Sequence, residues 1–92
     1  MAAIPVELPG LIHSCADGQA EVIVHADTFA GAMEQLCTDY PLLRNALYEP
    51  DGTLRQHVLV FFNEENCRWL DSHDVPTKDG DRIIIVQSVA GG

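Results

Sequence analysis

Apolar and polar residues alternate near the start of the chain, which is the pattern of a half-buried β-strand. In residues 3–10, one side of this strand carries Ile4, Val6 and Leu8, and the other carries Pro5, Glu7 and Pro9. A second alternation in residues 19–26 places Val22, Val24 and Ala26 on one face. The Asp17-Gly18 pair between the two segments is a turn signal. The pattern therefore predicts a β-hairpin.

The spacing of apolar residues becomes helical in residues 26–41. Gaps of three and four positions create one apolar stripe, which consists of Phe29, Ala32, Met33, Leu36, Cys37 and Tyr40. Asp27 or Thr28 is expected to cap the start of this helix, and Pro41 to mark its end. Residues 41–47 are expected to add a short second helical turn.

The second half of the chain predicts three more strands. Residues 56–63 and 82–89 are apolar on both faces, and residues 67–70 are interpreted as a very short strand after a polar turn at 63–66. Further turns are expected at Asp51-Gly52 and Asp79-Gly80. If the side chains of Val58, Val60 and Phe62 face the helix, those of Leu59 and Phe61 face away from it.

The resulting order, β-β-α-β-β-β, predicts an α+β fold in which one main helix packs on a mixed sheet of four or five strands. In the β-grasp version of this order, the first and last strands lie parallel at the centre of the sheet. Residues 1–88 are then expected to form the β-grasp domain, and residues 89–92 a flexible tail that leaves a central strand.

Length and charge narrow the classes of function. The chain has 92 residues, and its 14 acidic and five basic side chains give a net charge of −9. A single small domain is expected, and this charge argues against binding to nucleic acid or to an anionic membrane surface. The first ten residues have no secretory pattern, so a cytoplasmic protein, monomeric when free, is expected.

The sequence predicts no metal or cofactor bound by the chain itself. Its three cysteines, Cys15, Cys37 and Cys67, form no C-x-x-C pair and are expected to be reduced thiols. Its four histidines lack metal-ligand spacing. The acidic residues 71–81 lack the pattern of a calcium loop. Without a glycine-rich phosphate loop, any ATP would be bound by a partner.

Four outward apolar side chains suggest a docking surface for a partner. If Ile83 and Ile85 face inward, the outward face of the last two long strands carries Leu59, Phe61, Ile84 and Val86. They are expected to be largely exposed beside the tail, and exposed apolar patches tend to mark binding sites.

The chain ends in Gly91-Gly92, which suits a tail whose terminal carboxylate reacts in a partner's active site. Activation by ATP requires the carboxylate to lie about 3 to 3.5 Å from the α-phosphorus. A narrow channel admits backbone without side chains, and glycine adopts backbone angles closed to other residues. A frayed end is the alternative interpretation of the same residues.

The segment "KDGDRIIIVQSVAGG" resembles the C-terminal block of the ThiS/MoaD family, bacterial sulfur-carrier proteins with a ubiquitin-like fold. It has an acidic-glycine turn, a short apolar strand over 82–87 and a Gly-Gly end. Within the family, the chain is most similar to the branch that serves cysteine biosynthesis, through Phe61, Asn63, Glu64, Glu65 and Arg68.

The resemblance implies a carrier without catalysis of its own. An E1-like adenylyltransferase and sulfurtransferase would thread Val89, Ala90 and Gly91 into its ATP site and adenylylate Gly92. A sulfur donor would then leave a Gly92 thiocarboxylate, and an enzyme such as cysteine synthase or thiazole synthase would accept the sulfur. Cysteine, thiamine, molybdopterin or a sulfur-containing secondary metabolite are all open as the product.

Two other functions are compatible with the sequence. A ubiquitin-like modifier would use the same adenylylation to attach Gly92 to lysines of target proteins. A plain interaction module would use neither reaction, and its terminal glycines would be incidental. A thiocarboxylate, an isopeptide adduct, or normal function without the tail would distinguish the three.

Overall fold

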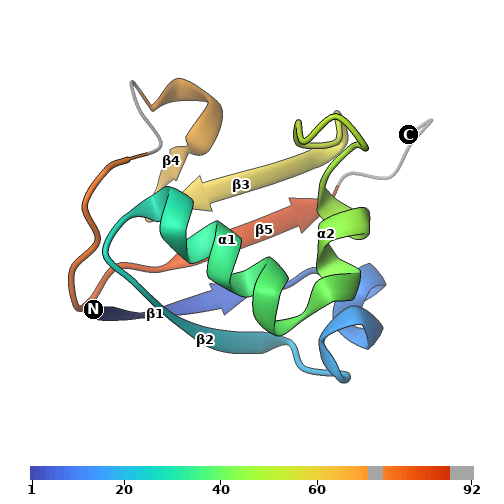
Figure 1. The fold of residues 1–92 in the computed structure, drawn as a ribbon, viewed down its shortest axis with the longest axis horizontal. Coiled ribbons are helices and arrows are strands. Elements are labelled where there is room, and N and C mark those ends of the chain that lie inside the picture. The colour runs from blue at the N-terminus through green and yellow to red at the C-terminus, as the bar shows by residue number, and fades with distance from the viewer. Residues whose placement is uncertain (71–73, 88–92) are drawn as a thin grey trace.

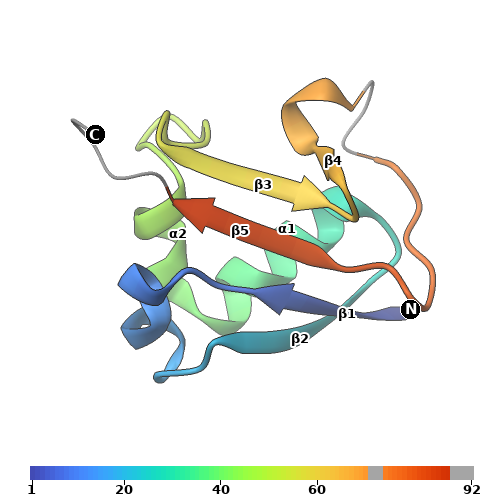
Figure 2. The ribbon, with the colours of Figure 1, turned by 180° about the vertical axis from the view of Figure 1, so that it is seen from behind.

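The computed structural model describes residues 1–70 and 74–87. Its elements are, in order, β1 (Ala2–Glu7), η1 (Gly10–Ala16), β2 (Glu21–Ala26), α1 (Phe29–Asp39), α2 (Pro41–Leu47), β3 (Val58–Phe62), β4 (Glu65–Asn66), η2 (Cys67–Trp69) and β5 (Ile83–Gln87), where η marks a 3-10 helix. The strands form one five-stranded sheet in the order β2-β1-β5-β3-β4. Helix α1 crosses one side of the sheet (Figure 1), and no described helix covers the other side (Figure 2).

The first and last strands pair in parallel, as the β-grasp order predicts. Val6 lies opposite Ile83 in this pairing. On its other side, β5 pairs antiparallel with β3, and Val60 lies opposite Ile85. The last described strand is therefore held from both sides near the middle of the sheet.

The hydrophobic core lies between α1 and the side of the sheet that it covers. The predicted inward residues of β3 and β5 are buried, as is the α1 stripe except for the half-buried Tyr40. Phe29 of α1 meets Phe62 of β3 with ring centroids 5.3 Å apart, at an interplanar angle of 50°. Full burial of a large apolar side chain contributes about 1.5–3 kcal/mol to stability, so this layer accounts for much of the folding energy.

The ends of α1 follow the predicted signals. The Thr28 hydroxyl accepts a hydrogen bond from the Gly31 N–H at 3.0 Å, which makes Thr28 the N-cap. The helix ends at Asp39, and Pro41 occupies the first turn of α2, where its missing N–H costs nothing. A Cβ at position 31 would lie 3.1 Å from the Thr28 hydroxyl oxygen and 3.7 Å from the Ala26 Cβ. Glycine thus lets the helix start close to the end of β2.

The connection between β1 and β2 is longer than the predicted hairpin turn. The two strands pair antiparallel along their whole length. Between them the chain forms η1, which packs against α2 and buries Ile12 and Ala16. Asp17 and Gly18 do form a turn, with φ values of 57° and 81°. The turn signal was correct, but the buried residues before it favoured a helical segment over a tight hairpin.

The prediction of a short strand at residues 67–70 is wrong. The paired residues are Glu65 and Asn66, which fall in the predicted polar turn and lie opposite Phe62 and Phe61. Cys67–Trp69 form η2 instead. The Asn66 side-chain oxygen accepts a hydrogen bond from the Arg68 N–H at 2.9 Å. This cap satisfies a backbone donor at the start of the helix and turns the chain out of the sheet.

Candidate functional site

The predicted reactive end of the chain follows the central strand β5. Gln87, the last residue of that strand, lies opposite Val58 of β3. The Gln87 side-chain oxygen is buried, and no described residue donates a hydrogen bond to it. The predicted tail residues, Val89, Ala90, Gly91 and Gly92, lie outside the described part of the chain. Their roles therefore remain predictions.

The four predicted docking residues lie together on the side of the sheet that α1 does not cover, and we call them the outer patch. Within it, Leu59 lies directly opposite Val86, and Phe61 directly opposite Ile84. Directly opposed side chains in an antiparallel pair have Cβ atoms about 4.5–5.5 Å apart. The outer patch is thus one continuous apolar surface across β3 and β5, and its Val86 lies one residue before the end of β5.

Exposure of the outer patch is lower than the sequence predicted. Val86 is exposed, at 40% of its full accessible surface. Leu59, Phe61 and Ile84 are half-buried. Their cross-strand partners shelter them, and the neighbouring strands add a rim, since Glu7 lies beside Ile84 and Asn66 beside Phe61. The patch therefore faces outward as predicted, but three of its members are only partly accessible.

The acidic-glycine turn before β5 has a structural role. Asp81 is only 5% exposed, and its carboxylate accepts hydrogen bonds from the Lys78 N–H at 2.9 Å and the Asn63 side-chain amide at 3.2 Å. Gly80 has φ 98°, a region that favours glycine. The turn thereby fixes where β5 begins, which is Ile83 and not the predicted Arg82.

Two of the residues that carry the family resemblance also support the fold. Asn63 has φ 59°, and its backbone N–H donates to the Arg82 carbonyl at 2.8 Å while its side-chain oxygen accepts from the Arg82 N–H at 3.1 Å. The Arg68 guanidinium donates to the carbonyls of Arg55 and Val58 at 3.3 and 3.4 Å. These contacts hold the ends of β3 beside the outer patch.

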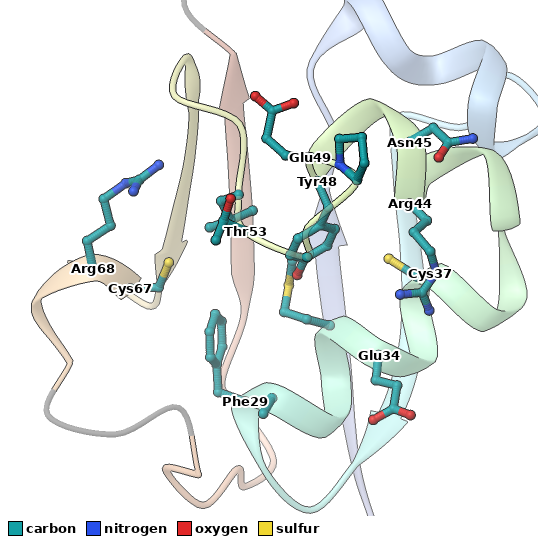
Figure 3. A pocket seen from close by; sticks show the side chains of 15 residues that line it. Phe29, Glu34, Cys37, Arg44, Asn45, Tyr48, Glu49, Thr53, Cys67 and Arg68 are labelled. Carbon is teal, nitrogen blue, oxygen red and sulfur yellow. The ribbon is translucent and has the colours of Figure 1, made fainter.

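A cleft of about 710 Å³ opens on the helix side, between α1, the end of α2, the 48–54 turn and η2 (Figure 3). Its apolar floor includes Phe29, Met33, Cys37 and Cys67, all of which are buried. The cleft lies on the opposite side of the sheet from the outer patch, so the two surfaces are separate.

The thiols at this cleft are poor nucleophiles. Burial raises the pKa of Cys37, with a smaller opposing effect of Arg44, and burial likewise raises the pKa of Cys67 against Arg68. Tyr48 lies between them (Figure 3), where burial, and then the negative charges of Cys37 and Cys67 when they are ionised in alkaline solution, raise its pKa to about 12. Because the thiolate is the reactive form of cysteine, this environment lowers the fraction of both cysteines that is reactive at neutral pH.

The described residues show neither a cluster of metal ligands nor a helix that could span a membrane. No group of three or more His, Cys, Asp or Glu side chains in residues 1–70 and 74–87 is arranged to hold a metal ion. Over the same ranges, the helices are too short or too polar for any of them to cross a bilayer.

Comparison with known proteins identifies the group to which this architecture belongs. The model of the ThiS family matches residues 6–92. The sulfur carrier protein CysO of Mycobacterium tuberculosis is 28% identical over 91 residues, covering 97% of this chain and 98% of that protein. This relative is named as a sulfur carrier, the class of protein that the C-terminal segment of the sequence resembles.

Solved structures show the same ubiquitin-like β-grasp fold. A chain of the Amycolatopsis orientalis BexX/CysO complex matches with a TM-score of 0.82 and 23% identity, covering 98% of this chain and all of that one. The small archaeal modifier protein 1 (SAMP1) of Methanosarcina acetivorans matches with a TM-score of 0.82 and 26% identity, covering 100% of this chain and 98% of that one. The family match, which extends from β1 to the terminal glycines, shows that this chain belongs to the ThiS family.

Proposed function

We propose that this chain is a sulfur carrier that works through the carboxylate of Gly92. An E1-like enzyme adenylylates this carboxylate and replaces AMP with sulfur, and a second enzyme takes the sulfur for biosynthesis. The chain is then a reusable protein substrate and not a catalyst. ATP is bound by the E1-like partner. The similarity to CysO, named as a sulfur carrier protein, supports this function. The resemblance of the sequence to the branch that serves cysteine biosynthesis favours a cysteine synthase as the sulfur acceptor.

The chemistry has two steps on the carrier. A Gly92 carboxylate oxygen attacks the α-phosphorus of ATP, and the bond to pyrophosphate breaks. The sulfur donor then attacks the acyl carbon, a C–S bond forms, and the C–O bond to AMP breaks. Both steps need a reactive end held in line with its partner atom, so much of their acceleration comes from positioning.

The position of β5 is the observation that carries this proposal. The sheet pairs β5 with β1 at Ile83 and Ile84, and with β3 along its whole length as far as Gln87, five residues before Gly92. Five extended residues reach at most about 17 Å. If residues 1–88 are the folded body and 89–92 a flexible tail, the partner's active site must lie within that distance of the end of β5. The partner must therefore bind the surface beside it.

The outer patch is the surface that meets this requirement. Its Val86 lies next to Gln87, and its apolar side chains span β5 and the adjoining β3. In this proposal Leu59, Phe61, Ile84 and Val86 dock the E1-like enzyme, and then the sulfur-accepting enzyme. Val89, Ala90 and Gly91 pass through the channel that leads to the active site. Small side chains fit such a channel.

Intact mass measurement tests the proposal. The protein is incubated with ATP, an E1-like enzyme encoded in the same genome and a sulfide source. We expect one oxygen to be replaced by sulfur, localised to Gly92 by fragmentation. A variant lacking Gly91 and Gly92 should not react, yet should keep its thermal unfolding midpoint. An unchanged mass with several competent enzymes would contradict the carrier function, and a collapsed midpoint would make the tail structural.

The similarity to SAMP1, a modifier by name, favours protein modification as the second candidate. It uses the same adenylate, but a lysine amine attacks the acyl carbon in place of sulfur. Peptide mapping of adducts from cells distinguishes the two functions. Isopeptide bonds between Gly92 and lysines, without a thiocarboxylate pool, would favour the modifier.

A further inference from the structure

Strand β2 forms one edge of the sheet, with β1 as its single neighbour among the described strands. The backbone pattern on this edge follows from one hydrogen bond, in which the Leu8 N–H donates to the Ala20 carbonyl at 2.8 Å. Hydrogen-bonded and non-hydrogen-bonded pairs alternate along an antiparallel ladder. The pairs formed by Val22 and Val24 are therefore bonded to β1, and those of Glu21, Ile23 and His25 are not.

The same alternation fixes what the free edge offers. Residues that do not bond to β1 direct their N–H and C=O groups away from it, toward the open side. Glu21, Ile23 and His25 thus present a row of backbone donors and acceptors along the edge. Their side chains are also exposed, and Ile23, the apolar one of the three, keeps 50% of its full accessible surface. Such an edge is a template for another strand.

The two ends of the β2 edge, on either side of Ile23, carry side chains of different charge. At one end, Glu21 lies directly opposite Glu7 of β1, so two carboxylates share one position of the sheet. At the other end, His25 lies opposite Ala3. The Asp27 carboxylate beyond it lies 3.9 Å from the Met1 amino group, which offsets its charge. One end is therefore acidic, and the other offers an imidazole.

We propose that β2 pairs with β2 of a second copy of this chain, antiparallel and centred on Ile23. In this register Ile23 meets Ile23 of the second copy, and each Glu21 meets the other copy's His25. These are the residues whose backbone groups face the open edge, so each such pair can exchange two hydrogen bonds. An imidazole N–H can donate to the carboxylate in either protonation state.

A second copy suits this edge because the pattern is self-complementary. A two-fold interface requires each residue to meet its own counterpart or a matching one, and an acid and an imidazole at equal distances from a central isoleucine satisfy this. The net charge of −9 opposes association, so the dimer is expected to be weak and to form at high protein concentration. This proposal departs from the monomer expected from the sequence, where the position of β2 at an edge is not visible.

The proposed dimer is independent of the proposed function. The edge strand β2 is separated from the outer patch on β5 and β3 by β1. A dimer through β2 would therefore leave both outer patches and both tails available to partners. Loss of dimerisation with normal thiocarboxylate formation, or the reverse, would separate the two proposals.

Sedimentation velocity over about a hundredfold range of protein concentration tests the dimer, because association by mass action depends on concentration. We expect Glu21→Lys to raise the dimer dissociation constant about tenfold, since two favourable cross-strand pairs become unfavourable. This change also brings the net charge closer to zero, which by itself would favour association. Glu64→Lys is the matched control: it makes the same charge change in an exposed turn near the opposite edge, and it should not weaken the dimer.

Mixing two weakened variants provides the sharper test. His25→Glu alone should also weaken the dimer, because it opposes two carboxylates. A mixture of Glu21→Lys with His25→Glu should form heterodimers, in which each altered position meets an opposite charge. A wild-type protein that stays monomeric over the whole range would overturn the proposal, as would a mixture no more associated than its components.

A proline variant tests the backbone part of the pairing. Ile23→Pro removes an N–H that β1 does not use, and proline is tolerated at sheet edges. We expect this variant to keep its far-UV circular dichroism spectrum and to remain monomeric. A folded Ile23→Pro protein that dimerises as strongly as wild type would place the interface elsewhere. If the variant does not fold, the charge variants still decide the matter.

Discussion

On β3 and β5, the two sides of the sheet carry the same types of apolar residue, but the two sides have different environments. On the side under α1, β3 and β5 present Val58, Val60, Phe62, Ile83 and Ile85, all of which are buried. On the other side, the same strands present the outer patch, with one exposed and three half-buried residues. Phe61 and Phe62 are neighbours in the chain, but only Phe62 meets an aromatic ring of the helix.

This difference shows what an apolar side chain contributes in each place. Under the helix, its burial is part of folding and is lost only when the protein unfolds. On the outer patch, most of the stabilisation that it can provide is available only when a partner covers it. The comparison therefore predicts that substitutions on the two sides affect different measurements.

The largest expected effect is on the covered side. Phe62→Ala should lower the free energy of unfolding by about 3 to 5 kcal/mol, because it removes a buried ring and leaves a cavity against Phe29. Chemical denaturation measures this loss. Partner affinity of the remaining folded protein should be unchanged. A loss below about 1 kcal/mol would mean that the helix does not pack on this strand as described.

The second prediction concerns the outer patch. Phe61→Asp should weaken binding to the E1-like partner by about 2 kcal/mol or more, as for an aromatic anchor at an interface. Because Phe61 is half-buried opposite Ile84, the change should also cost about 1 kcal/mol of stability through the lost cross-strand pair. Calorimetric titration and denaturation of the same variant measure both. If Phe61→Asp unfolds the protein but spares affinity, this surface belongs to the core.

The third prediction uses Tyr48, on the covered side. Its pKa is raised to about 12, above the usual value of about 10 that an unfolded chain would have. In alkaline solution the unfolded state loses this proton first, so the stabilisation is present below about pH 10 and is lost as the pH rises to about 12. Allowing for partial exposure, the loss is about 1 to 2 kcal/mol.

Tyr48→Phe isolates that contribution. The variant cannot ionise at this position, so its stability should fall less steeply between about pH 10 and about pH 12. The raised pKa values of Cys37 and Cys67 act in the same direction and should leave a smaller residual slope. Denaturation curves across this range measure the slope, and identical slopes for the two proteins would contradict the assignment to Tyr48.

Much of the fold could be predicted from the sequence because its signals are local and consistent with one another. Alternation in residues 3–10 and 56–63 gave the correct inward faces, and the Thr28 cap and Pro41 gave the correct helix ends. The predictions that failed concern short segments. Residues 67–70 are apolar enough for a strand, but the Asn66 cap forms a 3-10 turn, and four residues carry too little periodicity to distinguish the two.

The site could be predicted only in part, because exposure depends on neighbours from other strands. Alternation correctly predicted that the outer patch lies on one side of the sheet. It could not predict the cross-strand pairs, which leave three of the four residues, Leu59, Phe61 and Ile84, half-buried. The sequence predicts Asp81 only as a residue of a turn, and does not predict that its carboxylate is buried. Its contact with Asn63, 18 positions away, has no local signal. The edge position of β2 likewise depends on the order of strands in the sheet.

The smallest predicted effect concerns the start of the helix that makes the two sides different. Thr28→Ala should cost about 1 kcal/mol by removing the N-cap oxygen. Gly31→Ala should gain about 1 kcal/mol of helix propensity, but the new methyl group would lie 3.1 Å from the Thr28 hydroxyl oxygen and disturb the cap. The single change should therefore be close to neutral.

In the Thr28→Ala background the oxygen is absent, and the remaining contact, 3.7 Å to Ala26, is an ordinary one. Gly31→Ala should then show its full gain, so the two changes together should be more stable than the sum of their separate effects. A double-mutant cycle from denaturation curves measures this coupling. Strict additivity would show that the Thr28 hydroxyl moves aside without cost.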